Sequence, residues 1–246
     1  MKKISLFFSL LFLISLHVFA QVDSSRFTEI WNPVPKKVTA GKNYGDAPSD
    51  AVILFNGKDF SNWESDAQKP SVQWKLVNDA MTVGRGTGGI RTKEKFGDCQ
   101  LHIEWRSPDS IKGAGQGRGN SGIFLMGRYE LQVLDSYESR TYSNGQAGSI
   151  YKQHIPLVNA TRAPGEWQTY DVIFTAPRFK SDSSLISPAR ITVLHNNILV
   201  QNNVTLWGAT QYIGVPSYKM HSDKESIVLQ DHGDAVSFRN IWIRNL

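Results

Sequence analysis

Apolar and polar residues alternate along much of the chain after residue 50, in short runs separated by turn residues. Runs such as "AVILF", "QLHIEW" and "TYDVIF" are rich in β-branched and aromatic residues, as is typical of β-strands, and no amphipathic helix pattern stands out. In "RITVLHNNILVQ", Asn196 and Asn197 lie between two such runs and predict a tight hairpin turn. The pattern therefore predicts an all-β fold, a two-sheet antiparallel sandwich of the jelly-roll type.

Several of these strands carry polar side chains on one face. In "QLHIEWRS", alternation places His102, Glu104 and Arg106 on the face opposite the apolar residues. In "RYELQVLDSYES", Glu130 and Gln132 share a face, and Asp135 joins them only if a β-bulge shifts the alternation at Val133-Leu134. A polar row on a strand is either a solvated face with cross-strand ion pairs or part of a binding surface.

Two other segments add polar residues close to these rows. Asn120 lies in the Gly-rich loop "GRGNSG", and Gln230, Asp231 and His232 end a strand just before a glycine. We expect the rows to meet on one concave sheet face, lined by Glu104, Glu130, Gln132 and His232. Carboxylates and amides beside the aromatic residues of "RYELQVLDSYES" are what a sugar site needs, although His232 could equally be a capped turn residue.

Other chemistries find little support in the sequence. There is no Gly-x-Ser-x-Gly motif, and the single cysteine, Cys99, at a strand start is more typical of packing. The Gly-rich stretches at 84–89 and 113–120 do not lead into a helix, so they indicate turns and not phosphate loops. The histidines show no metal-ligand spacing, and a metal bound by distant strands stays open.

The first 20 residues have the pattern of a cleaved secretory signal, with Lys2 and Lys3, a long apolar run and Ala20 before Gln21. The alternative is a retained membrane anchor, because the run is nearly long enough to span a bilayer. Its removal takes away two lysines and no acid, so the formal charge falls from +5 to +3, too little to indicate nucleic acid binding. We expect a periplasmic or secreted bacterial protein with no membrane association after cleavage and an undetermined oligomeric state.

The rest of the chain is expected to form one domain with an N-terminal extension. Residues 21–49 are rich in Pro, Gly and Lys and predict an extended arm, or alternatively a disordered tail. Residues 50–246 are long enough to fold as a single sandwich.

Blocks of this sequence resemble a known family. Five blocks are similar, in order, to blocks of the 3-keto-disaccharide hydrolase domain family: "LFNGKDFSNWES", "GGIRTKEKFGDCQLHIEWRSP", "GQGRGNSGIFLMGRYELQVLDSYES", "NGQAGSIYKQHIPLVNATRAPGEWQTYDVIFTAPRF", which contains Tyr151, and "LQDHGDAVSFRNIWIRNL". The resemblance covers roughly residues 51–246 and implies a concanavalin A-like lectin/glucanase fold. It also implies cleavage of glycosides whose glucose unit is oxidised at carbon 3, with a small carbohydrate as the substrate. We expect no cofactor, and a bound metal ion stays open. The resemblance and the polar rows together give these candidate substrate-binding residues: Glu104, Arg106, Asn120, Gln132, Tyr151, Gln230 and Asp231.

The segment "ELQVLD" resembles the bulged catalytic strand of laminarinase-type glucanases, Glu-x-Asp-x-x-Glu, with two departures. Gln132 stands for the middle Asp and Asp135 for the final Glu, which puts ordinary glucanase activity in doubt. A 3-keto sugar needs only a base for the acidic hydrogen on carbon 2, a group that stabilises the enolate, and an acid.

The catalytic candidates are therefore Glu130 or Asp135 as the base and His232 or Arg106 at the enolate oxygen. The product could arise by elimination or by net hydrolysis. Two other classes stay open, namely a non-catalytic, lectin-like carbohydrate-binding protein and a conventional β-glucanase.

Overall fold

The computed structural model describes residues 26–67 and 69–246, so the predicted signal at 1–20 lies outside the described residues. The chain divides into two compact units, Met1–Val38 and Thr39–Leu246. The described part of the first unit contains a short 3-10 helix, η1 (Arg26–Thr28). In the part of the chain that is described, no helix is long and apolar enough to cross a membrane.

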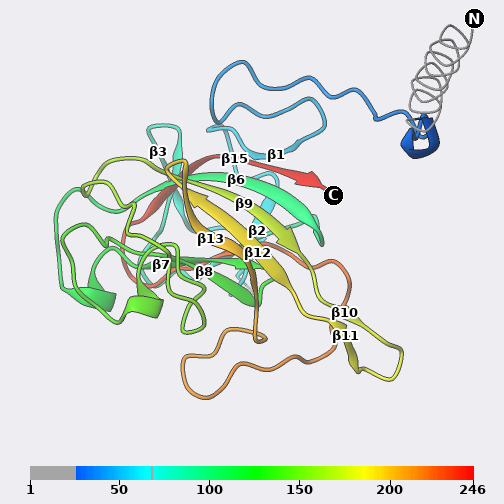
Figure 1. Cartoon of the computed structure of the whole chain (residues 1–246). Helices are drawn as coiled ribbons and strands as arrows, with labels where there is room; N and C mark the ends of the chain where they lie inside the picture. The colour runs from blue at the N-terminus through cyan, green and yellow to red at the C-terminus, as the bar shows by residue number, and fades with distance from the viewer. Residues whose placement is uncertain (1–25, 68) are drawn as a thin grey trace, which may run out of the picture. The chain divides into compact units, whose positions relative to one another are not determined.

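The second unit is an all-β sandwich, as the alternation of apolar residues predicts (Figure 1). Within the described residues, one sheet has eight strands in the order β13-β12-β9-β6-β15-β4-β3, with β1 also paired to β15. Its strands are β1 (Val52–Phe55), β3 (Lys75–Val77), β4 (Ala80–Thr82), β6 (Cys99–Arg106), β9 (Gln168–Thr175), β12 (Arg190–His195), β13 (Ile198–Thr205) and β15 (Ser237–Asn245).

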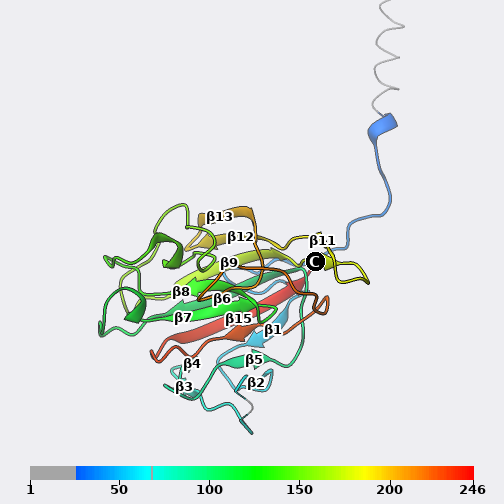
Figure 2. The same cartoon turned by 90° about the horizontal axis from the view of Figure 1, so that it is seen from below.

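The other large sheet has five strands in the order β2-β5-β14-β7-β8, again counted over the described residues. These are β2 (Trp63–Ser65), β5 (Ile90–Thr92), β7 (Ser121–Leu125), β8 (Tyr129–Val133) and β14 (Val228–Leu229). Figure 2 shows β7 and β8 crossing in front of strands of the larger sheet. A separate hairpin pairs β10 (Arg178–Phe179) with β11 (Leu185–Ser187), and two more 3-10 turns are η2 (Gly115–Gly117) and η3 (Ser143–Gly145).

The hairpin predicted at Asn196-Asn197 is confirmed. Strand β12 ends at His195 and β13 begins at Ile198, and the two strands pair in antiparallel fashion. Asn196 and Asn197 both have positive φ angles, of 52° and 68°, as a two-residue hairpin turn requires.

The hydrophobic core lies between the two large sheets. It is built from the apolar residues that alternation assigns to one face of each strand, such as Ile103 and Trp105 of β6 and Ile123 and Leu131 of β7 and β8. Each of these four side chains is fully buried. The polar residues between them must consequently point away from the core, outward from one sheet or the other.

This arrangement separates two polar rows that the sequence analysis placed together. Glu104 and Arg106 lie on β6, on the outer face of the eight-stranded sheet, whereas Glu130 lies on β8 in the other sheet. Glu104 accepts hydrogen bonds from Arg239 (2.6 Å) and Asn240 (2.9 Å) on the neighbouring β15. The expectation that Glu104 shares a face with Glu130 is therefore wrong, because the core lies between the two residues.

The outer face of the eight-stranded sheet also holds part of the predicted N-terminal arm. The hydroxyl of Tyr44 donates a hydrogen bond to Asp171 of β9 (2.5 Å), and the carbonyl of Gly45 accepts one from the indole of Trp242 (2.8 Å). Asp171 also hydrogen bonds to the buried imidazole of His102 (2.7 Å). Residues around 44–45 are thus held on this face by a polar network that does not reach the other sheet.

Candidate functional site

The outer face of the five-stranded sheet carries the polar residues of β8. Glu130 pairs with Phe124 and Gln132 with Gly122 across β7 and β8. Since Ile123 and its cross-strand partner Leu131 face the core, all four of these residues point to the outer side of the sheet. Alternation along "RYELQV" therefore correctly places Glu130 and Gln132 together on the outer sheet face, where both are nonetheless buried.

A polar pocket of about 260 Å³ opens over this face. Its walls come from β7, β8, the end of β14 and three loops. The lining residues are Gln116, Asn120, Phe124, Glu130, Gln132, Tyr151, Thr210, Tyr212, Gln230 and His232. Five residues singled out from the sequence and a sixth from the family resemblance thus meet here: Asn120, Glu130, Gln132, Gln230 and His232, together with Tyr151.

Glu130 is the acidic residue of this pocket, and it is buried. The residue is only 6% exposed, and burial raises the pKa of its carboxyl group to about 8. Its backbone is held by a hydrogen bond from its N–H to the hydroxyl of Thr210 (3.0 Å) and by one from the N–H of Tyr151 to its carbonyl (3.1 Å). A carboxyl group in this state can accept a proton near neutral pH, which is what a general base requires.

Gly122 makes room for the Glu130 carboxyl group. A Cβ atom on this residue would lie 2.7 Å from Glu130 Oε1 and 2.9 Å from the ring of Phe124. Because real Cβ atoms do not approach other atoms so closely, any larger residue at position 122 would displace the carboxyl group. Gly122 therefore contributes to the site because its missing side chain leaves room for the Glu130 carboxyl group.

Amide side chains surround the carboxyl group on one side. Asn120 donates from Nδ2 to the carbonyl of Gln116 (2.7 Å), and its own N–H is bound to Asp234 (2.8 Å). The Gln132 amide lies between Gln116 and Glu130: with its nitrogen turned toward Glu130, it donates to Glu130 Oε1 (3.2 Å) and to the carbonyl of Ser121 (3.1 Å). In that orientation Gln132 stabilises the ionised form of Glu130.

Hydroxyl and imidazole groups complete the pocket. The Tyr151 hydroxyl is hydrogen bonded to that of Tyr142 (2.5 Å), and burial together with this contact raises the pKa of Tyr151. Tyr151 therefore stays protonated and can act as a donor. His232 is exposed at the mouth of the pocket, whereas the buried Oε1 atom of Gln230 has no hydrogen-bond partner in the structure.

Asp135 does not reach this pocket. Strand β8 ends at Val133 and pairs with β7 in regular register up to that residue, so the described strand shows no bulge that would bring Asp135 back to the face. Asp135 is 2% exposed, forms an ion pair with Arg118 (2.7 Å), and caps the N–H of Tyr137. The expectation that it lies beside Glu130 is wrong, and its contacts are those of a residue that stabilises a loop.

Two other candidates also lie elsewhere. Arg106 is on the opposite sheet, where its guanidinium group lies 4.9 Å from the ring centre of Trp167. Asp231 accepts hydrogen bonds from the N–H groups of Gly88 (3.0 Å) and Gly233 (2.9 Å), which holds two loops together beside the pocket. Neither residue lines the pocket around Glu130.

The sequence analysis missed four residues of the lining. Gln116 belongs to the Gly-rich stretch that we interpreted only as a turn, and Thr210 and Tyr212 come from the long loop after β13. Phe124 and Gly122 are two residues apart on β7, so they point to the same side of the sheet. This spacing could have indicated that Phe124 points outward. No grouping of three His, Cys, Asp or Glu residues suited to a metal ion occurs in the ranges 26–67 and 69–246.

Comparisons with known proteins identify the family of this chain. Residues 50–244 match the 3-keto-alpha-glucoside-1,2-lyase-like domain family. The chain is 25% identical over 244 residues to a 3-keto-disaccharide hydrolase of Bacteroides thetaiotaomicron, covering 81% of this chain and 80% of that protein.

Solved structures that resemble this chain are also described as glycosyl hydrolases. A candidate glycosyl hydrolase of Parabacteroides distasonis has a TM-score of 0.85 and 50% sequence identity, over 90% of this chain and 96% of that one. Another candidate glycosyl hydrolase of the same organism, 19% identical, shares the fold with a TM-score of 0.60 over 85% of this chain and all of that one. These names support a carbohydrate-active, glycosidase-like function. The chain belongs to the 3-keto-alpha-glucoside-1,2-lyase-like domain family.

Proposed function

We propose that this protein cleaves the glycosidic bond of 3-keto-glycosides by elimination, with Glu130 as the base that removes the proton from carbon 2. One observation carries the proposal. Of the described residues that line the pocket, Glu130 is the one acidic side chain, and burial raises its pKa to about 8.

A single carboxyl group fits elimination better than conventional glycoside hydrolysis. Retaining and inverting glycosidases generally use two carboxyl groups, one on each side of the scissile bond. The second candidate, Asp135, is ion-paired with Arg118 outside the pocket. A 3-keto sugar does not need a second carboxyl group, because the ketone makes the hydrogen on carbon 2 acidic.

The proposed reaction proceeds in two steps. Glu130 takes the carbon-2 proton, and the electron pair of that C–H bond forms an enolate on the carbon-3 oxygen. The enolate then returns to a ketone as a double bond forms between carbons 1 and 2, and the bond from carbon 1 to the leaving oxygen breaks. The leaving oxygen takes up a proton from solvent water and Glu130 releases the carbon-2 proton to solvent, so the products are an alcohol and an unsaturated 3-keto sugar. Net hydrolysis would need a later addition of water.

The other pocket residues have supporting roles in this proposal. The Tyr151 hydroxyl and the His232 imidazole are suited to donate hydrogen bonds to the enolate oxygen, where stabilisation has the largest effect on rate. Asn120 and Gln132 are suited to orient the hydroxyl groups of the sugar. We further propose that residues 1–20 direct the chain to the periplasm or out of the cell, where its substrate would be met.

The test compares 4-nitrophenyl 3-keto-glucoside with unoxidised 4-nitrophenyl glucoside, each as both anomers, using protein that begins at Gln21. We expect release of nitrophenol above the enzyme-free background from a keto substrate only. Release from the unoxidised glucosides at a similar rate would indicate a conventional glycosidase. Binding of either sugar without any release would indicate a lectin-like protein.

A further inference from the structure

The hydroxyl group of Tyr151 connects the pocket of Glu130 to solvent through a second tyrosine. Tyr151 lines the pocket and is 9% exposed, whereas Tyr142 is 40% exposed. Their two hydroxyl oxygens are 2.5 Å apart, which is the distance of a short hydrogen bond in which either group can be the donor. The two phenol groups therefore offer a path for a proton from solvent to the pocket.

Tyr151 lies directly opposite Glu130. Leu131 pairs with Ile150 in an antiparallel bridge, and the N–H of Tyr151 donates to the carbonyl of Glu130 (3.1 Å). Leu131 and Ile150 both belong to the core, so their neighbours Glu130 and Tyr151 point to the outer side of the sheet. Side chains of directly opposite residues start about 5 Å apart. A sugar whose carbon 2 lies at Glu130 thus has the Tyr151 hydroxyl close to the substituents of its neighbouring carbons.

The other side chains of this pocket are less suited to protonate a leaving oxygen. Thr210 has an aliphatic hydroxyl group, which is a weaker acid than a phenol. Tyr212 is 72% exposed, and His232 is also exposed. An exposed side chain is solvated and is not held in one position, whereas the Tyr151 hydroxyl is fixed by its hydrogen bond to Tyr142.

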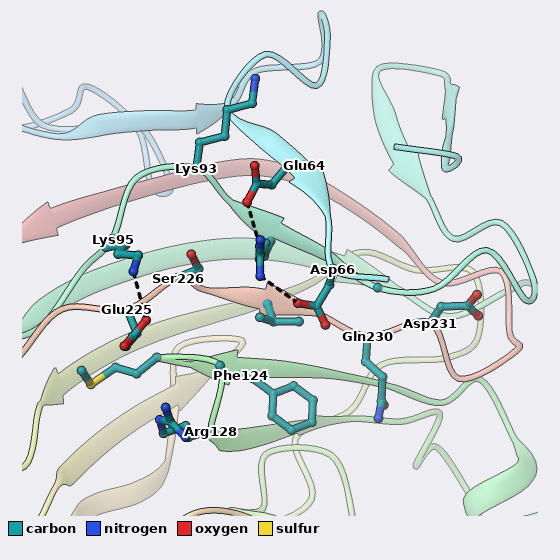
Figure 3. A pocket seen from close by; sticks show the side chains of 15 residues that line it. Glu64, Asp66, Lys93, Lys95, Phe124, Arg128, Glu225, Ser226, Gln230 and Asp231 are labelled. Carbon is teal, nitrogen blue, oxygen red and sulfur yellow. Dashed lines mark hydrogen bonds and ion pairs between the residues drawn. The ribbon is translucent and has the colours of Figure 1, made fainter. Parts of the chain in front are cut away.

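A larger pocket of about 500 Å³ borders the Glu130 pocket on another side (Figure 3). The two pockets share Phe124 and Gln230, an aromatic ring and an amide, neither of which is an acid. Beyond them, side chains of opposite charge are bound to each other, and an ion-paired carboxylate has no proton to give. The ion pairs drawn in Figure 3 join Arg91 to Glu64 and Asp66, and Lys95 to Glu225. These contacts favour protonation of the leaving oxygen from the side of Tyr151, which does not line the larger pocket.

Lys152 holds the tyrosine pair in place. Its ammonium group donates a hydrogen bond to the carbonyl of Tyr212 (2.6 Å) and lies 4.3 Å from the ring centre of that residue. The same group is 5.8 Å from the ring centres of Tyr142 and of Tyr151. Contacts of a cation with aromatic rings at such distances are attractive, so they keep the rings together at the edge of the pocket. The positive charge also favours the negative charge that develops on Tyr151 when it gives up its proton.

We infer that Tyr151 is the catalytic acid that protonates the leaving oxygen, and that Tyr142 is a positioning residue that resupplies this proton from solvent. The inference rests on the proposed function, in which the bond from carbon 1 to the leaving oxygen breaks. As it breaks, its electron pair takes the proton of the Tyr151 hydroxyl, the Tyr142 proton moves to the Tyr151 oxygen, and Tyr142 takes a proton from water. The net source of the proton is therefore solvent. His232 remains as the donor to the enolate oxygen, because one hydroxyl group cannot serve both oxygens at once.

The test uses two keto substrates that differ in the basicity of the leaving oxygen, 4-nitrophenyl 3-keto-glucoside and methyl 3-keto-glucoside. Nitrophenolate is a weak base and leaves without a proton, whereas methoxide is a strong base and needs one. Tyr151→Phe and Tyr142→Phe each remove one hydroxyl group and keep the ring. We expect kcat/KM for the methyl glycoside to fall by roughly 10²-fold in Tyr151→Phe. It should fall by roughly 10-fold in Tyr142→Phe, because water can partly replace that hydroxyl, and kcat/KM for the nitrophenyl glycoside should change by less than about 3-fold in both variants.

Tyr44→Phe is the matched control, because it removes a hydroxyl group that donates an equally short hydrogen bond, to Asp171 on the other sheet (2.5 Å). It should leave both values of kcat/KM unchanged, and thermal melting should confirm that all three variants fold. If the wild-type protein cleaves both substrates but either pocket variant loses the same factor on both, or loses nothing on the methyl glycoside, the inference is wrong and the proposed function stands. Cleavage of the nitrophenyl glycoside alone by the wild-type protein would show that no acid is supplied, which also overturns the inference. If neither keto substrate is cleaved, the proposed function fails and this inference fails with it.

Discussion

The burial of Glu130 should make the stability of the protein depend on pH in a predictable way. In the folded protein the pKa of this carboxyl group is about 8, whereas an unperturbed glutamate has a pKa of 4.5. The folded state therefore binds the proton more tightly than the unfolded state does. As a result, stability is fully present below about pH 4.5 and is lost progressively as the pH rises through 8.

The magnitude follows from the size of the pKa shift. Each pKa unit corresponds to about 1.4 kcal/mol, so the shift from 4.5 to about 8 sets an upper limit of about 5 kcal/mol. Water that enters the pocket when the group ionises reduces this value, and we expect roughly 2 to 5 kcal/mol. Glu130→Gln removes the ionisable group but keeps its size and most of its hydrogen bonds, so it should remove this dependence.

The assay is urea unfolding of the wild-type protein and of Glu130→Gln at pH 5 and at pH 8.5. The quantity of interest is the change in free energy of unfolding between the two pH values, compared between the two proteins, because other titrating groups contribute equally to both. The wild-type protein should lose a few kcal/mol more than the variant. Parallel losses in the two proteins would show that Glu130 is not buried as an uncharged acid, and our account of the base would have to be abandoned.

Three further predictions concern other parts of the chain. Asp135→Asn should lower the free energy of unfolding by roughly 3–5 kcal/mol in urea titrations, because it leaves the partly buried Arg118 without its partner; an unchanged value would mean that the ion pair does not stabilise the loop. Burial opposes protonation of His102, but hydrogen bonds to Asp171 and Glu104 outweigh it and raise the pKa of the imidazole to about 9. The contribution of the charged imidazole to stability is therefore present below pH 6.5 and is lost as the pH rises through 9. Between pH 6.5 and 9, the free energy of unfolding measured by urea titration should fall less for His102→Gln than for the wild-type protein. Equal losses in the two proteins would contradict a positive charge on His102. For localisation, N-terminal sequencing of periplasmic protein should begin at Gln21, and retention of residues 1–20 in the membrane fraction would contradict the predicted signal cleavage.

Local patterns were enough to predict much of this fold and part of its site. Alternation along β8 correctly assigned Glu130 and Gln132 to one outward face, because side-chain direction in a strand depends only on sequence position. The hairpin at Asn196-Asn197 could be predicted for a similar reason, since both residues tolerate positive φ angles.

The errors arose where the answer depends on contacts between distant segments. Alternation places Glu104 on a polar face of β6, but only the pairing of β6 with β9 and β15 decides to which sheet that face belongs. Asp135 was misplaced because "ELQVLD" resembles a bulged catalytic strand, and the apolar pair Val133-Leu134 is compatible with a bulge as well as with the actual end of the strand. The loop that supplies Thr210 could not be assigned to the pocket, since no local pattern shows where a long loop lies.

The most direct test of the central claim is the turnover of a 3-keto-glycoside by Glu130→Gln. If Glu130 removes the carbon-2 proton, kcat should fall by ~10²–10⁴-fold, the usual contribution of general base catalysis, while the protein stays folded. The wild-type rate should also rise with pH up to about 8, as the buried carboxyl group ionises. If kcat stays nearly intact and only KM rises, Glu130 binds hydroxyl groups, the base lies elsewhere, and the proposed mechanism is wrong.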